Sequence, residues 1–320
     1  MKQFNEKTFV PDENPNWSYI SQCQVLSEDF IEKFKDYVSW NHISSYQVIS
    51  ETFIEKFKDK VNWYYTSHFQ VLSEEFIEKF QDKVEWDNIS HYQVLSEEFI
   101  EQFQNKVKWD NISSSQVLSE EFIEQFQNKV KWDNISSSQT LSEEFIEKFK
   151  DKVKWDNISQ YQVLSEDFIE KFQDKVEWDN ISHYQSLSKE FIKKHNLTIS
   201  EDNWLYWTKE QKLEYVKENT DYEVVSDEWI YAFKSVKRNN ASVYKPGQLY
   251  EVGKTYKAHC DCNQSNADSF GLSACTRKWA LGYHSKGNLF KVKVPIDKIG
   301  CIVHDGSKIR CFELEIMGQA

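Results

Sequence analysis

The residues best suited to chemistry gather near the C-terminus. Five of the six cysteines of this 320-residue chain follow position 259, and histidines lie among them. Thiolate and imidazole are the ligands that zinc prefers, so these residues are candidate ligands. The candidates are His259, Cys260, Cys262, Cys275, Cys301, His304 and Cys311.

The spacing of these candidates matches no standard zinc motif. "HCDC" is followed by twelve residues and one cysteine, rather than by a second CxxC pair. Two interpretations therefore remain open. One is a zinc site whose candidate ligands are His259, Cys260, Cys262 and Cys275, and the other is a set of ordinary buried thiols with no cofactor.

An enzyme site is a second possibility for the same segment. Its polar residues include His284, Asp297, His304, Asp305 and Arg310. The sequence does not arrange them as a nucleophile, a base and an orienting group. We therefore predict no catalytic residues, and keep as the alternative a nucleotide-handling or zinc-dependent enzyme or sensor that the rest of the chain delivers.

A pattern that favours recognition precedes this segment. Tryptophan recurs every 23 residues without an insertion, so the chain contains eight tandem copies, which begin at Trp17, Trp40, Trp63, Trp86, Trp109, Trp132, Trp155 and Trp178. Such regularity indicates a repeat array in which each unit buries its apolar face against its neighbours.

The copies differ at two adjacent residues, which we call the variable pair, and also at the residue just before each tryptophan. The pairs are Gln22-Cys23, Ser45-Tyr46, His68-Phe69, His91-Tyr92, Ser114-Ser115, Ser137-Ser138, Gln160-Tyr161 and His183-Tyr184. If the pairs line one surface, they form a row of polar and aromatic side chains suited to binding a protein or peptide. The predicted partner-binding residues are His68, Phe69, His91, Tyr92, Tyr161, His183 and Tyr184. The alternative is that the pairs are merely tolerant solvent positions, and the two Ser-Ser pairs are the least distinctive of the row.

The sequence pattern of each copy predicts two helices. In "LSEEFIEKF", Ser73 can cap a helix of about three turns whose apolar residues include Phe76, Phe80 and Val84. Asp87 can then cap a second, shorter helix, "NISHYQVL". A coiled coil is excluded because a 23-residue repeat with fixed caps does not continue a heptad.

The flanking segments divide the chain into further regions. Residues 1–16 read as an N-terminal cap, 17–195 as the eight repeats, and 196–243 as a helical cap or linker whose aromatic residues cover the last repeat. All eight glycines lie from Gly247 onward, where alternating β-rich runs surround "SACTRKWALGYHS". The fold class that we expect is mainly α, an α-solenoid of short helix-turn-helix repeats followed by a small α+β domain at 244–320.

Charge and hydropathy limit the partners. From 17 to 200 the chain has 33 acidic and 20 basic residues, whereas from 201 to 320 it has 16 acidic and 17 basic residues. The acidic array argues against nucleic acid, including a code of one base per repeat, because phosphate contacts need clustered cations. With no apolar stretch of about 18 residues, we predict a cytoplasmic protein that has no membrane partner.

The wording of the repeats resembles that of known viral proteins. "LSEEFIEKF" with "WDNIS" is similar to short tandem repeats in proteins of giant viruses and large phages, a resemblance that covers about 17–195 and implies no established activity. The tail, "FGLSACTRKWALGYHSKGNLFKVKVPIDKIGCIVHDGSKIRCFELEIMG", resembles a small C-terminal domain of phage proteins, including relatives of the rapid-lysis B protein. Its matching positions are Gly271, Leu272, Trp279, Ala280, Val294, Asp297, Lys308 and Arg310.

One departure from that pattern bears on catalysis. Ser273 stands where the phage pattern has histidine, so any chemistry that needs this histidine is absent here. The resemblance implies a viral protein in the host cytoplasm.

Overall fold

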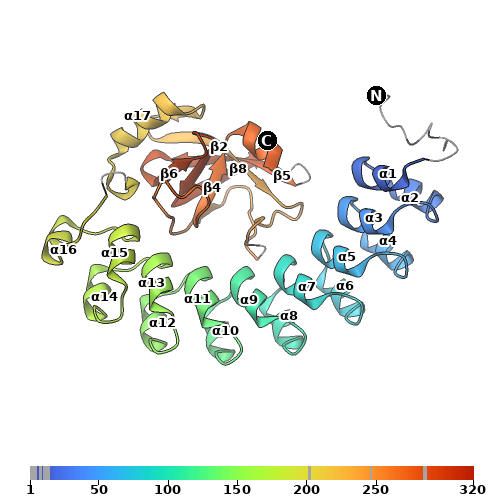
Figure 1. Ribbon diagram of the computed structural model, residues 1–320, viewed down its shortest axis with the longest axis horizontal. Coiled ribbons are helices and arrows are strands. Elements are labelled where there is room, and N and C mark those ends of the chain that lie inside the picture. The colour runs from blue at the N-terminus through green and yellow to red at the C-terminus, as the bar shows by residue number, and fades with distance from the viewer. Residues whose placement is uncertain (1–5, 7–8, 10–14, 201–202, 246, 284–286) are drawn as a thin grey trace. The chain divides into compact units, whose positions relative to one another are not determined.

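The chain forms two compact units, Met1–Ile112 and Ser113–Ala320, in the computed structural model (Figure 1). The structure describes residues 6, 9, 15–200, 203–245, 247–283 and 287–320. Most of the predicted N-terminal cap, residues 1–16, therefore lies outside the described residues. The boundary between the units falls inside the fifth repeat, and each unit is described by itself.

Every copy consists of two short helices, which we call A and B, and its tryptophan is position 1 of 23. The A helices are α1 (Trp17–Cys23), α3 (Trp40–Tyr46), α5 (Trp63–Phe69), α7 (Trp86–Tyr92), α9 (Trp109–Ser115), α11 (Trp132–Ser138), α13 (Trp155–Tyr161) and α15 (Trp178–Tyr184). The B helices are α2 (Glu28–Lys33), α4 (Glu51–Lys56), α6 (Glu74–Lys79), α8 (Glu97–Gln102), α10 (Glu120–Gln125), α12 (Glu143–Lys148), α14 (Glu166–Lys171) and α16 (Lys189–Lys194). Within each unit, the A helices of successive copies pack side by side.

The predicted caps are correct for the B helices and wrong for the A helices. Ser73 caps α6 by accepting a hydrogen bond from the Phe76 amide. Helix α7 begins at Trp86 rather than after Asp87, and its N-cap residue, Glu85, makes no side-chain capping bond. The Glu85 amide instead donates to the Ser67 hydroxyl at 3.0 Å, so a serine of the preceding A helix positions the start of α7.

The B helices are also shorter than the predicted three turns. Helix α6 ends at Lys79, and the Phe80 carbonyl then accepts the amides of Lys83 at 2.8 Å and Val84 at 3.1 Å. This tight turn needs no left-handed residue, which explains how the array turns without glycine. Asn196, with φ of 51°, follows the last B helix and ends the array.

Each copy buries a small apolar core at positions 4, 10, 14, 15, 18 and 22. In the fourth copy these residues are Ile89, Leu95, Phe99, Ile100, Phe103 and Val107, all at most 8% exposed. The tryptophan packs against the two phenylalanines, and Trp86 lies 5.2 Å from Phe103 between ring centroids. Burial of each side chain stabilises by about 1.5–3 kcal/mol, but one copy contributes too few to offset its ordering entropy.

Within each unit, a glutamine at position 8 connects a copy to the one before it. The Gln139 side-chain amide donates to the carbonyls of Ser113 and Gln116, each at 2.9 Å, and accepts the Leu118 amide at 3.2 Å. Gln139 is 4% exposed, so these three backbone groups are screened from water. The same three bonds are made by Gln47, Gln70, Gln93, Gln162 and Gln185.

The two ends of the array substitute for a missing neighbour. Glu6 accepts hydrogen bonds from the amide and hydroxyl of Ser27, as Glu51 does for Ser73 in the third copy. At the other end, His195 replaces the second phenylalanine of the copy and stacks on Trp178 at 4.8 Å. His195 therefore has a packing role.

The C-terminal domain is a wholly antiparallel sheet with short helices. Its elements are η2 (Trp204–Tyr206), α17 (Lys209–Asn219), β1 (Glu223–Ser226), β2 (Trp229–Val236), β3 (Thr255–Lys257), β4 (Leu272–Cys275), α18 (Arg277–Tyr283), β5 (Asn288–Pro295), η3 (Ile296–Lys298), β6 (Ile299–Val303), β7 (Lys308–Cys311) and β8 (Glu313–Gln319). The strand order is β3-β8-β5-β2-β4-β7-β6, with β1 paired to β2. Trp204 and Val216, from η2 and α17, lie in the same hydrophobic core as the strands.

The interpretation of 196–243 as a helical cap or linker is therefore wrong for its second half, which contains β1 and β2. Residues 229–236 form β2, which lies between β5 and β4, so the sheet begins before residue 244. In β2 every second residue is buried, and this period of two is the signature of a strand in "WIYAFKSV". Trp204 is buried in the core of this domain, although it was expected to cover the last repeat.

Among the described residues, no helix combines the length and the apolar character needed to cross a membrane.

We expect Gln139→Ala to lower the free energy of unfolding by about 2–3 kcal/mol, because it leaves buried backbone groups without hydrogen-bond partners. The matched control is Gln24→Ala at the same position of the first copy, where the side chain is half-buried and the Gln24 backbone carbonyl that Gln47 uses is retained. Urea unfolding followed by circular dichroism measures both, and equal losses would contradict the role of the amide.

We expect Thr66→Ile to raise stability by about 1 kcal/mol. Thr66 occupies position 4, where the other copies carry isoleucine, and its buried hydroxyl has no hydrogen-bond partner among the described residues. The reciprocal change, Ile89→Thr, should destabilise, and thermal unfolding of the two variants tests both signs.

Candidate functional site

The variable pairs lie at positions 6 and 7, at the C-terminal end of each A helix. Because A helices pack side by side within each unit, the pairs of successive copies are neighbours, and we call them the variable row. In the unit Ser113–Ala320 the row belongs to the fifth to eighth copies. There it contacts the C-terminal domain of the same chain.

Two tyrosines of the row enclose a phenylalanine of the domain. The Phe270 ring lies 4.7 Å from Tyr161, edge to face, and 5.8 Å from Tyr184, between ring centroids. Burial raises the pKa of both tyrosines, and the Asp261 carboxylate adds to the effect. Aromatic pairs with this geometry contribute about 0.5–1.5 kcal/mol each beyond the area they bury.

The Ser-Ser pairs of the fifth and sixth copies receive a loop of the domain. The Gly247 amide donates to the Ser115 carbonyl at 3.1 Å, and the Lys245 ammonium donates to the Ser138 carbonyl at 2.5 Å. A Cβ on Gly247 would lie 2.5 Å from the Val117 nitrogen, so this approach requires glycine. The two Ser-Ser pairs, the least distinctive in sequence, thus have small side chains where Gly247 and Lys245 of the domain approach the array.

The eighth copy makes further contacts with the segment that leads into the domain. The Asn203 side chain donates to the His183 carbonyl at 3.0 Å, and the Tyr206 hydroxyl donates to the Gln185 carbonyl at 3.2 Å. The acceptors are carbonyls at the C-terminal end of α15, which lack partners inside the helix. The His183 ring itself lies 2.7 Å from the Asp179 carbonyl, within its own helix.

The predicted row residues of the first unit stack on one another. The His68 ring lies between Phe69, at 4.0 Å, and Tyr92, at 3.7 Å, and His91 is 4.3 Å from Tyr92. Phe69 is 52% exposed. Of the seven predicted partner-binding residues, Tyr161 and Tyr184 contact the C-terminal domain.

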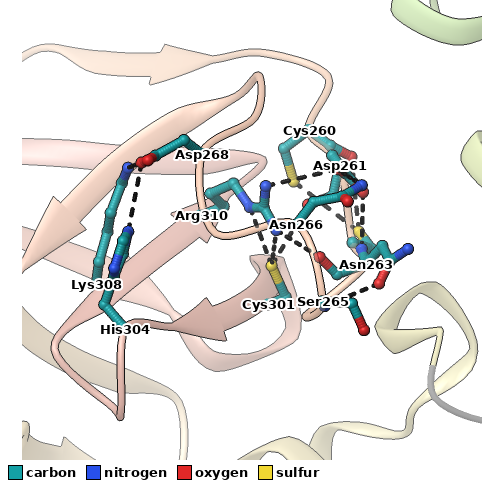
Figure 2. Close-up of polar contacts among 11 residues, drawn as sticks. Cys260, Asp261, Asn263, Ser265, Asn266, Asp268, Cys301, His304, Lys308 and Arg310 are labelled. Atoms are coloured by element: carbon teal, nitrogen blue, oxygen red, sulfur yellow. Dashed lines mark hydrogen bonds and ion pairs between the residues drawn. The ribbon is translucent and has the colours of Figure 1, made fainter.

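A buried polar cluster supports the loop that carries Phe270. Figure 2 shows Arg310 extending toward Asp261 and Cys301. Arg310 Nη1 lies 3.5 Å from the Asp261 carboxylate, while Nε and Nη2 donate to the Cys301 sulfur at 3.1 and 2.9 Å. Arg310 and Asp261 are fully buried, so loss of either would leave a buried charge without its partner. Nη2 also donates to the Asn263 carbonyl at 2.6 Å, which holds the loop on the sheet.

An ion-paired carboxylate holds the other side of this loop. Asp268 lies 3.2 Å from Lys308 and 3.4 Å from His304, as Figure 2 shows. The hydrogen bond from Lys308 lowers the pKa of Asp268, with His304 acting in the same direction. His304 and Asp305 both adopt positive φ, which places them in the tight turn between β6 and β7.

The zinc candidates do not form a ligand set. The sulfurs of Cys260 and Cys262 are 4.0 Å apart, but the Cys275 thiol donates to the Phe233 carbonyl instead. Cys260 packs so closely on Gly300 that a Cβ there would lie 2.2 Å from its sulfur. Burial raises the pKa of Cys260, and no group of three or more potential ligands converges in the described part of the chain. The geometry favours buried thiols.

The residues considered for an enzyme site have separate partners. Arg310 is engaged by Asp261 and Cys301, His304 by Asp268, and Asp297 by the neighbouring Lys298. His284 lies outside the described residues. Sequence reasoning missed Phe270, Lys245 and Gly247, since nothing local distinguishes them, whereas the glutamine at position 8 is visible as an invariant letter in all eight copies.

Comparisons of the chain with protein-family models, curated proteins and solved structures found no match.

His259 of the C-terminal domain lies against the backbone of Tyr184 and Gln160 in the row, and its titration makes the stability of the protein depend on pH. Burial lowers its pKa to about 4, against the opposing influence of Asp261 and the backbone of Tyr184 and Gln160. Because the pKa is lower in the folded state than in the unfolded chain, the unfolded state binds the proton more tightly. Stability is therefore lost as the pH falls from about 6.5 toward 4.

We expect the wild type to lose about 2 kcal/mol more stability between pH 7 and pH 5 than His259→Gln loses. Urea unfolding at the two pH values measures the difference, and carboxylates that titrate in both proteins cancel. Parallel losses in the two proteins would show that His259 is not the group responsible.

Proposed function

We propose that the repeats form a non-enzymatic α-solenoid scaffold whose variable row is a docking surface for protein. Copies of one frame, joined by the same three glutamine bonds and packed A helix on A helix within each unit, support a solenoid. The apolar core and the position-8 glutamine are buried and nearly the same in every copy, so the residues free to bind a partner are those of the variable row.

The observation that carries this proposal is that part of the row already holds a folded domain. Tyr161 and Tyr184 enclose Phe270, and the Ser115 and Ser138 carbonyls accept hydrogen bonds from Gly247 and Lys245. The row residues are aromatic where the Phe270 ring enters and small where the Gly247 backbone and the Lys245 side chain approach. That correspondence favours a binding surface over tolerant solvent positions.

The remaining row residues suit a second protein or peptide. The pairs of the first unit include His68-Phe69 and His91-Tyr92, which expose aromatic rather than basic groups. Residues 17–112 carry 17 acidic and 9 basic residues, a balance of −8, which disfavours nucleic acid. In this proposal the scaffold presents its C-terminal domain while the first unit recruits a partner. The resemblance to viral repeat proteins implies that it does so in the host cytoplasm.

We expect Tyr161→Ser combined with Tyr184→Ser to release the loop 259–270 from the row. Serine is the residue that the fifth and sixth copies carry at this position, so the repeat frame should fold normally. Loss of two aromatic contacts, about 1–3 kcal/mol, should speed amide hydrogen exchange in the loop by about 5- to 100-fold.

The matched control is Tyr37→Ser, another exposed tyrosine of the array that lies away from the row, and it should leave exchange in the loop unchanged. If exchange in the loop is the same in the double variant as in the wild type, the row does not hold the domain and the proposal fails.

A further inference from the structure

The first three copies depart from the others at positions 2 and 3 of the A helix. The fourth to eighth copies carry Asp-Asn there. In the fourth, fifth, seventh and eighth copies the asparagine donates to the position-2 carbonyl of the preceding copy, as Asn157 does to Asp133 at 3.0 Å. The first three copies carry Ser18-Tyr19, Asn41-His42 and Tyr64-Tyr65 instead.

These substitutions have a cost within the frame. His42 and Tyr65 cannot donate the asparagine bond, and the His42 Nδ1 atom is buried without a hydrogen-bond partner among the described residues. Copies that are otherwise nearly identical have thus exchanged a stabilising hydrogen bond for aromatic rings. A gain in binding is a physical reason for that exchange.

The rings at positions 3 and 7 share a face, because these positions are separated by one helical turn, and Tyr64 at position 2 joins them through its contact with Tyr65. Tyr65 lies 6.2 Å from Phe69 and 5.4 Å from Tyr64 between ring centroids. Helices α1, α3 and α5 pack side by side, which places Tyr19 and His42 on the neighbouring helices. We call Tyr19, His42, Tyr64, Tyr65 and Phe69 the aromatic patch, and Tyr19, Tyr64 and Phe69 are 51%, 54% and 52% exposed.

We infer that the aromatic patch binds a segment of a partner protein that carries aromatic and basic side chains. This inference rests on the proposed docking function of the row and specifies the chemistry of its partner. Exposed tyrosine and phenylalanine rings provide the large contact area that dominates binding energy at interfaces.

The aromatic half of this specificity follows from the occupied part of the row. Position 7 belongs to both surfaces, and in the seventh and eighth copies its rings receive the aromatic side chain of Phe270. Phe69 presents a ring at the same position of the third copy. A partner side chain that packs on Phe69 is therefore expected to be aromatic.

The basic half follows from charge. The negative balance of residues 17–112 attracts cations, and tyrosine and phenylalanine faces bind ammonium and guanidinium groups. The chain supplies an example at the end of α11, where the Lys245 ammonium reaches the last carbonyl of the helix. The C-terminal ends of A helices carry partial negative charge, which favours a cation in that place.

The test uses the full chain and three labelled synthetic peptides of equal length. One alternates Lys and Phe between Gly residues, the second replaces Lys by Glu, and the third replaces Phe by Ala. Fluorescence anisotropy should show that the wild type binds the Lys-Phe peptide at least about tenfold more tightly than either of the others.

The critical variant combines Tyr64→Asp, Tyr65→Asn and Phe69→Ser. These are the residues that the fifth and sixth copies carry at the same positions, so the frame should fold, and circular dichroism confirms this. We expect the variant to bind the Lys-Phe peptide at least about tenfold more weakly. The Tyr37→Ser control should bind it as the wild type does.

Three results would overturn the inference: no peptide binding by the wild type, equal binding by the variant, or equal binding of all three peptides. Displacement of the peptide by a short oligothymidylate would also overturn it, in favour of a nucleic-acid surface. None of these experiments changes Tyr161 or Tyr184. The hydrogen-exchange experiment on the loop 259–270 therefore tests the docking function independently of the peptide experiment.

Discussion

The side-chain amide at position 8 is the interaction on which the array depends. It makes three buried hydrogen bonds, all to backbone groups of the preceding copy, and water cannot replace them. A buried polar group without a partner costs more than a formed bond contributes, so a copy in the wrong register would be strongly disfavoured. An insertion would displace the amide from its acceptors, which explains why the 23-residue spacing never varies.

This constraint separates the residues that hold the array from those that are free to recognise a partner. Positions 4, 8, 10, 14, 15, 18 and 22 are filled by the core and the glutamine bonds, whereas positions 6 and 7 lie at the open end of the A helix. Their side chains can change without disturbing the stack. The side chains of the row can therefore differ from copy to copy. They are small at Ser115 and Ser138 and aromatic at Tyr161 and Tyr184.

The C-terminal domain meets the row through two segments that its own interior supports. The buried pair of Arg310 and Asp261 holds the loop that ends at Phe270, and Gly247 allows the other loop to approach the Ser115 carbonyl. A buried ion pair contributes little net stability, but displacing the loop would leave the Arg310 charge buried without its partner, which disfavours other positions of the loop. The position of this loop determines the docking contact, because the Phe270 ring has to fit between the rings of Tyr161 and Tyr184.

The amino-acid sequence by itself determined the number of copies, their length, the B-helix caps and the place of the variable pairs, because each is a local pattern repeated eight times. It also contained the invariant glutamine, although only the structure shows that its bonds are buried and join successive copies. Residues 229–236 were wrongly assigned to a helix because the spacing of their aromatic residues fits both the helical period of about 3.6 and the strand period of 2. Pairing with β5 determines that they form a strand. The contacts of Phe270, Lys245 and Gly247 were decided by tertiary structure alone, since they join residues about 85 to 130 positions apart and no local propensity records such a distance.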